Sequence, residues 1–161
     1  MLEVVNYNHT NTPYSLSIQL LEKINLSEDL ESSNREVLFI EDICKRIQKS
    51  KSVLYVLKNE DDIIGLIALS FTSVKEQPSL QIDYVIVDKK YQGKELKVLD
   101  NCKPFRYLMK LAVVLAKRIS QEIGLRYIVL SPDNDDLENK YKQVNFQKLN
   151  DNWMYLKIQN S

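Results

Sequence analysis

Hydrophobic and polar positions follow two different periods along this chain, and the changes of period mark its elements. Between residues 53 and 71, two apolar, β-branched runs flank the polar sequence N-E-D-D, a pattern typical of a β-hairpin. The apolar run at 80–87 predicts a third antiparallel strand. From Pro104 to Ile123, apolar residues recur every three or four positions, which predicts a long amphipathic helix ending before Gly124.

The same periodicities predict shorter elements on both sides of this central part. Strands are predicted at residues 2–7, 126–130, 146–149 and 153–158. Helices are predicted at residues 14–24, 37–47 and 135–144. Thr12 before Pro13 is predicted to cap the first helix, and residues 25–34 are predicted to be irregular. A crossover of helical length precedes 126–130, so this strand is expected to be parallel to 80–87.

This order predicts an α/β fold of the α+β type in a single domain, residues 1–161. We expect a mixed central sheet of about six to seven strands, flanked by about four helices. A chain of 161 residues with 44% hydrophobic and 27% charged residues is typical of one globular domain. No apolar run approaches the roughly 20 residues that cross a bilayer, and we expect a cytoplasmic protein without a membrane partner.

Few residues are available for metal or triad chemistry. Cys44 and Cys102 have no metal-ligand spacing, and His9 is the only histidine. The sequence therefore predicts no metal site and no Ser-His triad.

Positive charge is concentrated after the strand at 80–87. Between residues 89 and 110 there are seven Lys/Arg and two acids, in a chain of zero net charge. They are Lys89, Lys90, Lys94, Lys97, Lys103, Arg106 and Lys110, with Glu95 and Asp100. A strand followed by a basic loop and a helix start is a common arrangement for binding phosphate, because the first amides of the helix are unpaired. The alternative is a solvated basic loop without a ligand.

The order of motifs resembles the GNAT superfamily of acetyl-CoA-dependent N-acetyltransferases. The resemblance rests on V-D-K-K-Y-Q-G-K after a strand, the long helix, G-L-R-Y-I-V-L, and N-x-x-L-x-x-x-Y-x-x-x-N-F. In that family the loop Q/R-x-x-G-x-G/A holds the pyrophosphate of CoA with backbone amides. Val87, Tyr91, Gln92 and Gly93 stand at matching places.

The chain departs from the family in the second half of this loop. Glu95 and Lys97 stand where the family has small residues, and a glutamate adds both a side chain and a charge of the wrong sign. Residues 95–103 are interpreted as an insertion before the helix. Either lysines and helix-start amides hold the phosphates instead, or cofactor binding has weakened.

The resemblance implies a set of residues that bind acetyl-CoA. They are Val85, Ile86, Val87, Gln92, Gly93, Lys94, Lys103, Phe105, Arg106, Asn134 and Tyr141. Tyr141 matches the family's tyrosine acid, which protonates the leaving thiolate, and Asn145 replaces the usual glycine at a position that tolerates positive φ. Asn134 is either a contact of the pantetheine arm or only a turn residue.

For the base, Asp83 inside the strand at 80–87 is the first candidate, because burial would raise its pKa to a useful value. Glu76 is the other candidate, and Asp83 could equally be an exposed strand residue. The first two helices, the loop at 72–79 and the C-terminal strands are expected to line the acceptor pocket.

The expected function is transfer of an acetyl group from acetyl-CoA to a primary amine of a small molecule or of a peptide or protein. The alternative is a non-catalytic binding or regulatory module on the GNAT fold. The expected partner is a small-molecule or peptide amine without nucleic acid, and the expected assembly is a monomer or a homodimer. The sequence does not identify the acceptor.

Overall fold

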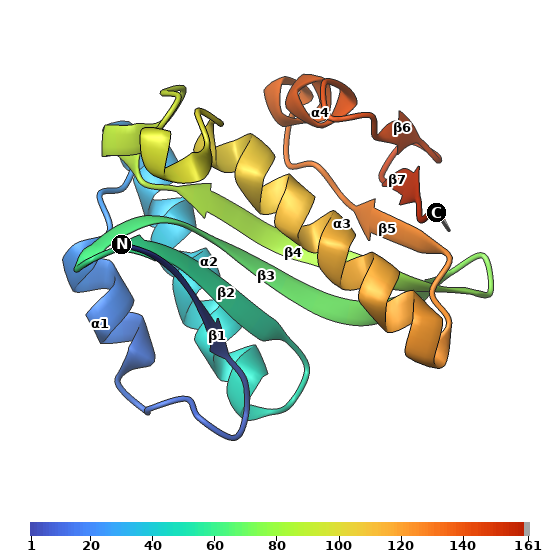
Figure 1. Cartoon of the computed structure of the whole chain (residues 1–161), viewed down its shortest axis with the longest axis horizontal. Coiled ribbons are helices and arrows are strands. Elements are labelled where there is room, and N and C mark those ends of the chain that lie inside the picture. Colours follow the sequence, from blue (N-terminus) through green and yellow to red (C-terminus); the bar gives the residue numbers. More distant parts are fainter. Residues whose placement is uncertain (160–161) are drawn as a thin grey trace. The chain divides into compact units, whose positions relative to one another are not determined.

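The computed structural model describes residues 1–159, which form four α-helices and a seven-stranded mixed sheet in the order β1-β2-β3-β4-β5-β7-β6. The strands are β1 (Leu2–Tyr7), β2 (Val53–Asn59), β3 (Asp62–Val74), β4 (Gln77–Val87), β5 (Tyr127–Leu130), β6 (Gln147–Lys148) and β7 (Met154–Lys157). The helices are α1 (Leu16–Lys23), α2 (Leu30–Gln48), α3 (Pro104–Ile123) and α4 (Asp135–Lys142), with the 3₁₀ helices η1 (Lys89–Tyr91) and η2 (Lys97–Leu99). The predicted fold class is confirmed (Figure 1).

The chain divides into two compact units, and each is described by itself. The first unit comprises residues 1–69 and 84–108, and the second comprises residues 70–83 and those from 109 onward. Strands β3 and β4 and helix α3 contribute residues to both units.

In the first unit, α1 and α2 pack against the sheet through a common apolar core. β1 pairs antiparallel with β2, and β2 with β3. Leu20 of α1, Ile43 of α2, Leu54 of β2 and Ile86 of β4 are all buried in this core. The continuous apolar run of β3 is buried at every position from 63 to 69, as expected for a strand covered on both faces.

In the second unit, β5 pairs parallel with β4 and antiparallel with β7. The parallel pairing, which places Leu80 opposite Ile128, confirms the prediction made from the length of the crossover. The predicted bounds of α3 are also confirmed. Gly124 follows the helix with φ +72°, a conformation that glycine adopts without steric cost.

Three local predictions are wrong. Thr12 does not cap α1: its hydroxyl donates to the Asn8 carbonyl, and the helix begins at Leu16. Residues 25–34 are not irregular throughout, because the Asp29 side chain accepts from the Ser32 amide and starts α2 at Leu30. Residues 72–79 are not a loop.

Instead, β3 and β4 extend through residues 72–79 as a hairpin. Lys75 and Glu76, both with positive φ, form a two-residue turn between them. The local hydrophobicity is too low at the strand ends to reveal this extension, because both strands are half-exposed there.

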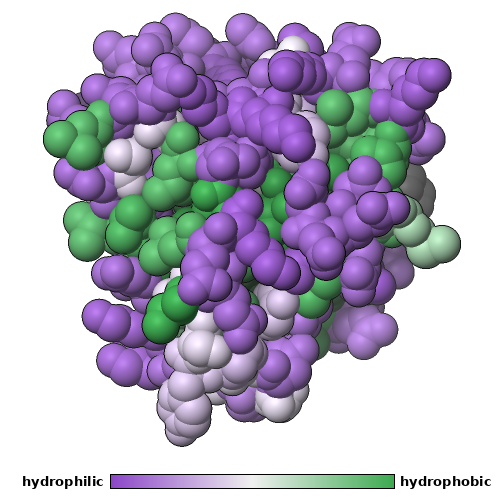
Figure 2. All heavy atoms as spheres, turned by 90° about the vertical axis from the view of Figure 1, so that its left-hand side faces the viewer, coloured by the Kyte–Doolittle hydropathy of each residue, from purple (hydrophilic) through white to green (hydrophobic). Residues whose placement is uncertain are grey.

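Hydrophobic side chains also reach the surface. Figure 2 shows the side of the molecule on which α1 lies, where hydrophobic atoms form a broken band between hydrophilic areas. Ile18 of α1 and Leu30 and Leu38 of α2 are exposed. No helix within residues 1–159 is long and apolar enough to span a bilayer, and no group of histidine, cysteine or acidic side chains there could hold a metal ion.

Candidate functional site

The end of β4 is held in place by a close approach to β3. Val85 and Val87 are half-buried, whereas Ile86 is buried in the core of the first unit. A Cβ atom at Gly65 of β3 would lie 2.9 Å from the Ile86 carbonyl oxygen and 3.1 Å from Leu108 of α3. A side chain at this position would force its neighbours to shift, so Gly65 permits the close approach to the end of β4.

Directly after β4, Asp88 is the one fully buried acid among residues 1–159. Its carboxylate accepts hydrogen bonds from the Asn25 amide at 2.8 Å and from the Lys90 amide at 2.8 Å. The Asn25 side-chain nitrogen lies 3.2 Å from both carboxylate oxygens. Sequence analysis missed this residue, because a polar residue between a strand and a lysine-rich loop gives no signal of burial.

The first lysines of the loop are paired with acids from distant segments. Lys89 forms an ion pair with Glu28, and the hydrogen bond and charge of Lys89 lower the pKa of the Glu28 carboxyl. Lys90 lies 3.5 Å from Asp62, whose carboxylate also accepts from the Tyr91 hydroxyl at 2.9 Å. The basic cluster counted along the sequence is therefore partly neutralised by tertiary contacts.

The middle of the loop is open. Gln92 donates from its side-chain nitrogen to the Val87 carbonyl at 3.1 Å, which turns the loop back toward the strand end. Gly93 has φ +71°, and a Cβ atom at this residue would have no neighbouring atom within 4 Å, so the space beside its Cα is open. Lys94 is exposed beside it.

The segment interpreted as an insertion is folded. Leu96 and Cys102 form an isolated antiparallel bridge, with the Leu96 amide donating to the Cys102 carbonyl at 3.2 Å. Between them, Leu99 is 1% exposed, and Asp100 and Asn101 adopt left-handed backbone conformations. Residues 95–103 therefore form a compact turn with its own apolar anchor, and not the glycine loop of the family.

The basic residues at the start of α3 are available to a ligand. The Lys103 carbonyl accepts from the Tyr107 amide, so the helix begins at Pro104 and the amides of Phe105 and Arg106 belong to its first turn. Lys103 and Arg106 are exposed, and neither side chain takes part in an ion pair within residues 1–159. An anion is stabilised at such a helix start by the amides and by the helix dipole.

Tyr141, Asn134 and Asp83 belong to the second unit. Tyr141 is 7% exposed and lies in the last turn of α4. Its ring packs edge-on against that of Phe146, with the ring centroids 5.6 Å apart. Burial, followed by the nearby Asp133 carboxylate, raises the pKa of the Tyr141 phenol well above its usual value. Asn145 has φ +76°, the left-handed conformation that the sequence predicts for it.

Asn134 has a clear structural role. Its side-chain oxygen accepts from the Leu137 amide at 2.9 Å and caps α4. The predicted contact with pantetheine stays a prediction, and the capping bond occupies the oxygen but leaves the side-chain nitrogen available.

The two candidate bases differ in their surroundings. Asp83 is half-buried, and its carboxylate accepts from the Ser70 hydroxyl at 2.9 Å. Glu76 is exposed in the turn between β3 and β4. Asp83 therefore has the more defined position of the two.

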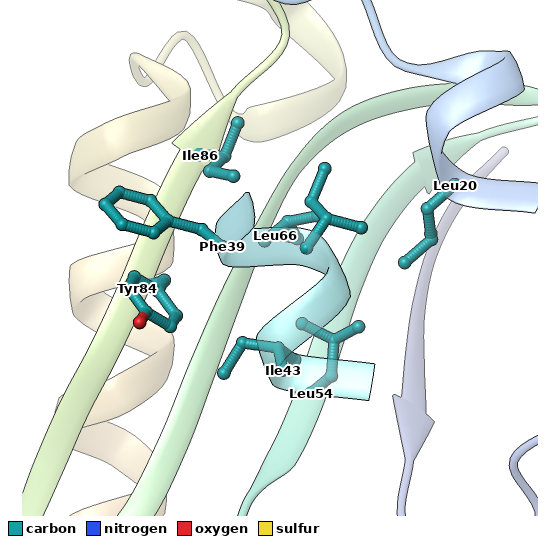
Figure 3. A pocket seen from close by; sticks show the side chains of 8 residues that line it. Leu20, Phe39, Ile43, Leu54, Leu66, Tyr84 and Ile86 are labelled. Atoms are coloured by element: carbon teal, nitrogen blue, oxygen red, sulfur yellow. The ribbon is translucent and has the colours of Figure 1, made fainter. Parts of the chain in front are cut away.

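A small apolar hollow lies between α1, α2 and the sheet of the first unit (Figure 3). It has about 200 Å³ of space outside atoms, part of it open to solvent, and is lined by Leu20, Phe39, Ile40, Ile43, Leu54, Leu66, Tyr84 and Ile86. Phe39 and Tyr84 stack with ring centroids 4.2 Å apart, and the Tyr84 hydroxyl lies 3.2 Å from the Asp42 carboxylate. Of the segments expected to line the acceptor pocket, only the first two helices line this hollow, and the acceptor pocket stays a prediction.

No protein-family model and no curated protein matches the sequence. Solved structures do match the fold. One is a tyrosine-to-phenylalanine mutant of the toxin AtaT, bound to the C-terminus of the antitoxin AtaR. Its TM-score is 0.74 and its sequence identity 16%, and the match covers 98% of this chain and 92% of the AtaT chain.

Two related structures contain further ligands. AtaTR bound with acetyl-CoA has a TM-score of 0.72 and 16% identity, and covers 98% of this chain and 93% of its own. AtaT complexed with acetyl-methionyl-tRNAfMet has a TM-score of 0.70 and 15% identity, over 98% and 95% of the two chains.

These complexes correct one expectation. The expected partner was a small-molecule or peptide amine without nucleic acid, whereas proteins of this fold are solved with a tRNA and, for KacTA, with DNA. The expectation relied on zero net charge, and net charge does not describe one exposed surface. The agreement over nearly the whole chain shows that this protein has the GNAT fold, as the resemblance in its sequence implies.

Proposed function

We propose that this protein is an N-acetyltransferase that transfers the acetyl group of acetyl-CoA to the amine of an aminoacyl-tRNA. The shared fold and the acetyl-CoA and tRNA complexes of its neighbours support this proposal. Within the chain, the observation that carries it is Tyr141, a buried phenol in the last turn of α4, at the place of the family's tyrosine acid. A neutral phenol is the form that can donate a proton to a leaving thiolate.

The residues present fit an anionic cofactor at the start of α3. Lys103 and Arg106 are exposed there without ion pairs within residues 1–159, beside the first-turn amides. In the proposal they hold the phosphates together with Lys94, while Val85, Ile86 and Val87 of β4 offer backbone groups to the pantetheine arm. The thioester supplies the activated acetyl group.

Proton movements are assigned to two side chains. Asp83, held by the Ser70 hydroxyl, takes a proton from the acceptor amine directly or through water. Tyr141 gives a proton to the sulfur as the carbon–sulfur bond breaks, and the amide bond forms between the acceptor nitrogen and the acetyl carbon. Both residues belong to the second unit.

The decisive experiment is acetyl transfer from radiolabelled acetyl-CoA to a pool of charged tRNAs, with free amino acids and polyamines as alternative acceptors. We expect label in the aminoacyl-tRNA fraction. Tyr141→Phe should lower kcat by roughly ten- to a thousandfold, the range for a single positioned proton donor.

Tyr155→Phe is the matched control. Its hydroxyl, on β7 of the same unit, contacts only the exposed Gln147 side chain among the described residues, and its removal should leave the rate unchanged. An unchanged rate in Tyr141→Phe would remove Tyr141 from the mechanism. Label only in free amines would contradict the proposed acceptor.

The pH profile gives an independent measurement. A free phenol ionises near pH 10, and burial moves the pKa of Tyr141 upward, so the acid form persists at every pH below about 10. We therefore expect kcat to show no alkaline decline below about pH 10 that depends on Tyr141. A decline centred near pH 8 that disappears in Tyr141→Phe would contradict a raised pKa.

One observation favours a second candidate, a non-catalytic module. Glu95 and Lys97 stand where the family has small residues, and residues 95–103 form a folded turn instead of an amide cradle. This candidate predicts no transfer to any acceptor, with or without CoA binding. Calorimetry with CoA alongside the transfer assay separates the two candidates.

A further inference from the structure

The connector between α1 and α2 is bonded to the beginning of the basic loop at several points. This connector, residues 24–29, starts at the buried Ile24 and ends at Asp29, the cap of α2. The Lys89 amide donates to the Asn25 carbonyl at 2.9 Å, while the Asn25 amide donates to the Asp88 carboxylate at 2.8 Å. These reciprocal bonds join two segments that lie 63 residues apart in the sequence.

The Asp88 carboxylate organises both partners of this contact. One of its oxygens accepts from Lys90 and thereby caps η1, and the other accepts from the Asn25 backbone. Its own amide donates to the Ile64 carbonyl at 2.8 Å, which ties the same residue to β3. A residue that is 1% exposed and bonded to three segments, to two by its carboxylate and to β3 by its amide, has little freedom to move independently of any of them.

We propose that Asp88 and Asn25 form a clamp that makes the basic loop and the α1–α2 connector move as one body, with Asp88 as a positioning residue. The inference rests on the proposed function for its ligand. CoA held by the loop then restrains the connector and, through it, α1 and α2, the two helices that line the apolar hollow. Occupancy of the cofactor loop is thereby transmitted to the helices without any contact between cofactor and connector.

The other bonds of the loop do not provide this coupling. Asp62 accepts from the Tyr91 hydroxyl and pairs with Lys90, but it lies in the exposed start of β3 and contacts no connector residue among the described residues. The ion pair of Lys89 with Glu28 does reach the connector, yet Glu28 is highly exposed and such pairs are weak in water. The buried carboxylate is the rigid link.

The test is hydrogen exchange of residues 24–29 and 88–92 in the free full-length protein. Asn25→Pro removes the backbone N–H that donates to the Asp88 carboxylate, and the extended conformation of Ile24 suits a following proline. Asp88→Asn replaces one carboxylate oxygen, which accepts hydrogen bonds, by an NH2 group, which donates them. A donor then faces the N–H groups that were bonded to that oxygen. Asp62→Asn makes the same chemical change on the other side of the loop and serves as the matched control.

We expect Asp88→Asn to speed exchange of the Asn25 and Lys90 amides together by roughly tenfold or more, because buried donors lose their acceptor. Asn25→Pro should speed exchange in 88–92 as well as in its own segment. Asp62→Asn should leave 24–29 unchanged. If Asn25→Pro alters only its own segment, the clamp is wrong, and this variant decides the question even if Asp88→Asn fails to fold.

Addition of CoA gives the second part of the test. In the wild-type protein CoA should slow exchange in 88–92 and in 24–29. In Asn25→Pro it should slow exchange only in 88–92, with affinity within about twofold of wild type. If CoA slowed exchange in 88–92 but not in 24–29 of the wild-type protein, the proposed transmission from the loop to the connector would be wrong. If CoA protects neither segment, the proposed function fails, while the exchange rates of the free variants still decide the clamp.

Discussion

The two halves of the loop between β4 and α3 are both rich in lysine, yet they are held in different ways. Residues 88–92 are bonded to distant segments through Asp88, Lys89 and Tyr91. Residues 93–103 bond to one another, through the bridge between Leu96 and Cys102. The charges of the first half are therefore paired within the fold, whereas the second half presents Lys94, Lys97 and Lys103 to solvent.

This difference shows why a count of charges along a sequence does not locate an anion site. Lys89 and Lys90 carry the same charge as Lys103, but acids from residues 28 and 62 lie beside them. The potential at a point depends on all charges within about 10 Å, the screening length at moderate salt, whatever their distance in sequence. The comparison predicts that the second half, and not the first, carries the affinity for a polyanion.

The largest expected effect comes from the anchor of the second half. Leu99→Ala should lower the free energy of unfolding by about 2–5 kcal/mol, the range for a fully buried leucine. Val98→Ala, at a half-buried neighbour, is the control and should cost clearly less. Urea denaturation measures both. A loss below about 0.5 kcal/mol for Leu99→Ala would mean that backbone bonds alone hold this half.

The next effect concerns the phosphates. Lys103→Ala combined with Arg106→Ala should weaken CoA binding about a hundredfold or more, because each contact to a charged oxygen contributes on the order of 1.5–3 kcal/mol. Lys89→Ala combined with Lys90→Ala is the matched control in the first half, and we expect less than about a threefold change. Calorimetry at low and high salt measures both, and wild-type binding should weaken with salt.

Equal losses in the two double variants would break the comparison, because the paired lysines would then contribute as much as the exposed ones. Wild-type affinity of the Lys103/Arg106 variant at both salt concentrations would remove the start of α3 from the phosphate site. Restoring glycines at Glu95 and Lys97 should not rescue the double variant, since the folded turn still separates these positions from the helix.

The smallest expected effect tests what positions the first half of the loop. Gly65→Ala would place a Cβ 2.9 Å from the Ile86 carbonyl oxygen, so the end of β4 must shift, at a cost of about 1–3 kcal/mol. CoA affinity should fall as well. Gly124→Ala is the control: its φ of +72° makes alanine strained, but nothing lies near its Cβ, so stability should fall without loss of CoA affinity. Unchanged CoA affinity in Gly65→Ala would show that the contact between Gly65 and Ile86 does not position the CoA site.

The candidate site was predictable where a residue's role depends on its neighbours in sequence. The start of α3 at Pro104 follows from helix periodicity, and the left-handed conformation of Asn145 is implied by the resemblance, which has a glycine there; both are found. The burial of Asp88 and its contact with Asn25 were not predictable, because the partner lies 63 residues away and Asp88 looks like a loop residue. The capping role of Asn134 was left open for the opposite reason: one asparagine suits both a turn and a ligand contact.

The sequence by itself determined the element order, the bounds of α3 and the parallel pairing of β5 with β4. These features depend on the period of apolar positions and on the length of a crossover, which are properties of contiguous chain. Only the tertiary structure decided which lysines are neutralised, which carboxylate is buried, and that a Cβ at Gly65 would crowd the Ile86 carbonyl. Charge pairing and burial depend on distances in space, and the folded chain sets those distances between segments that carry no local sign of one another.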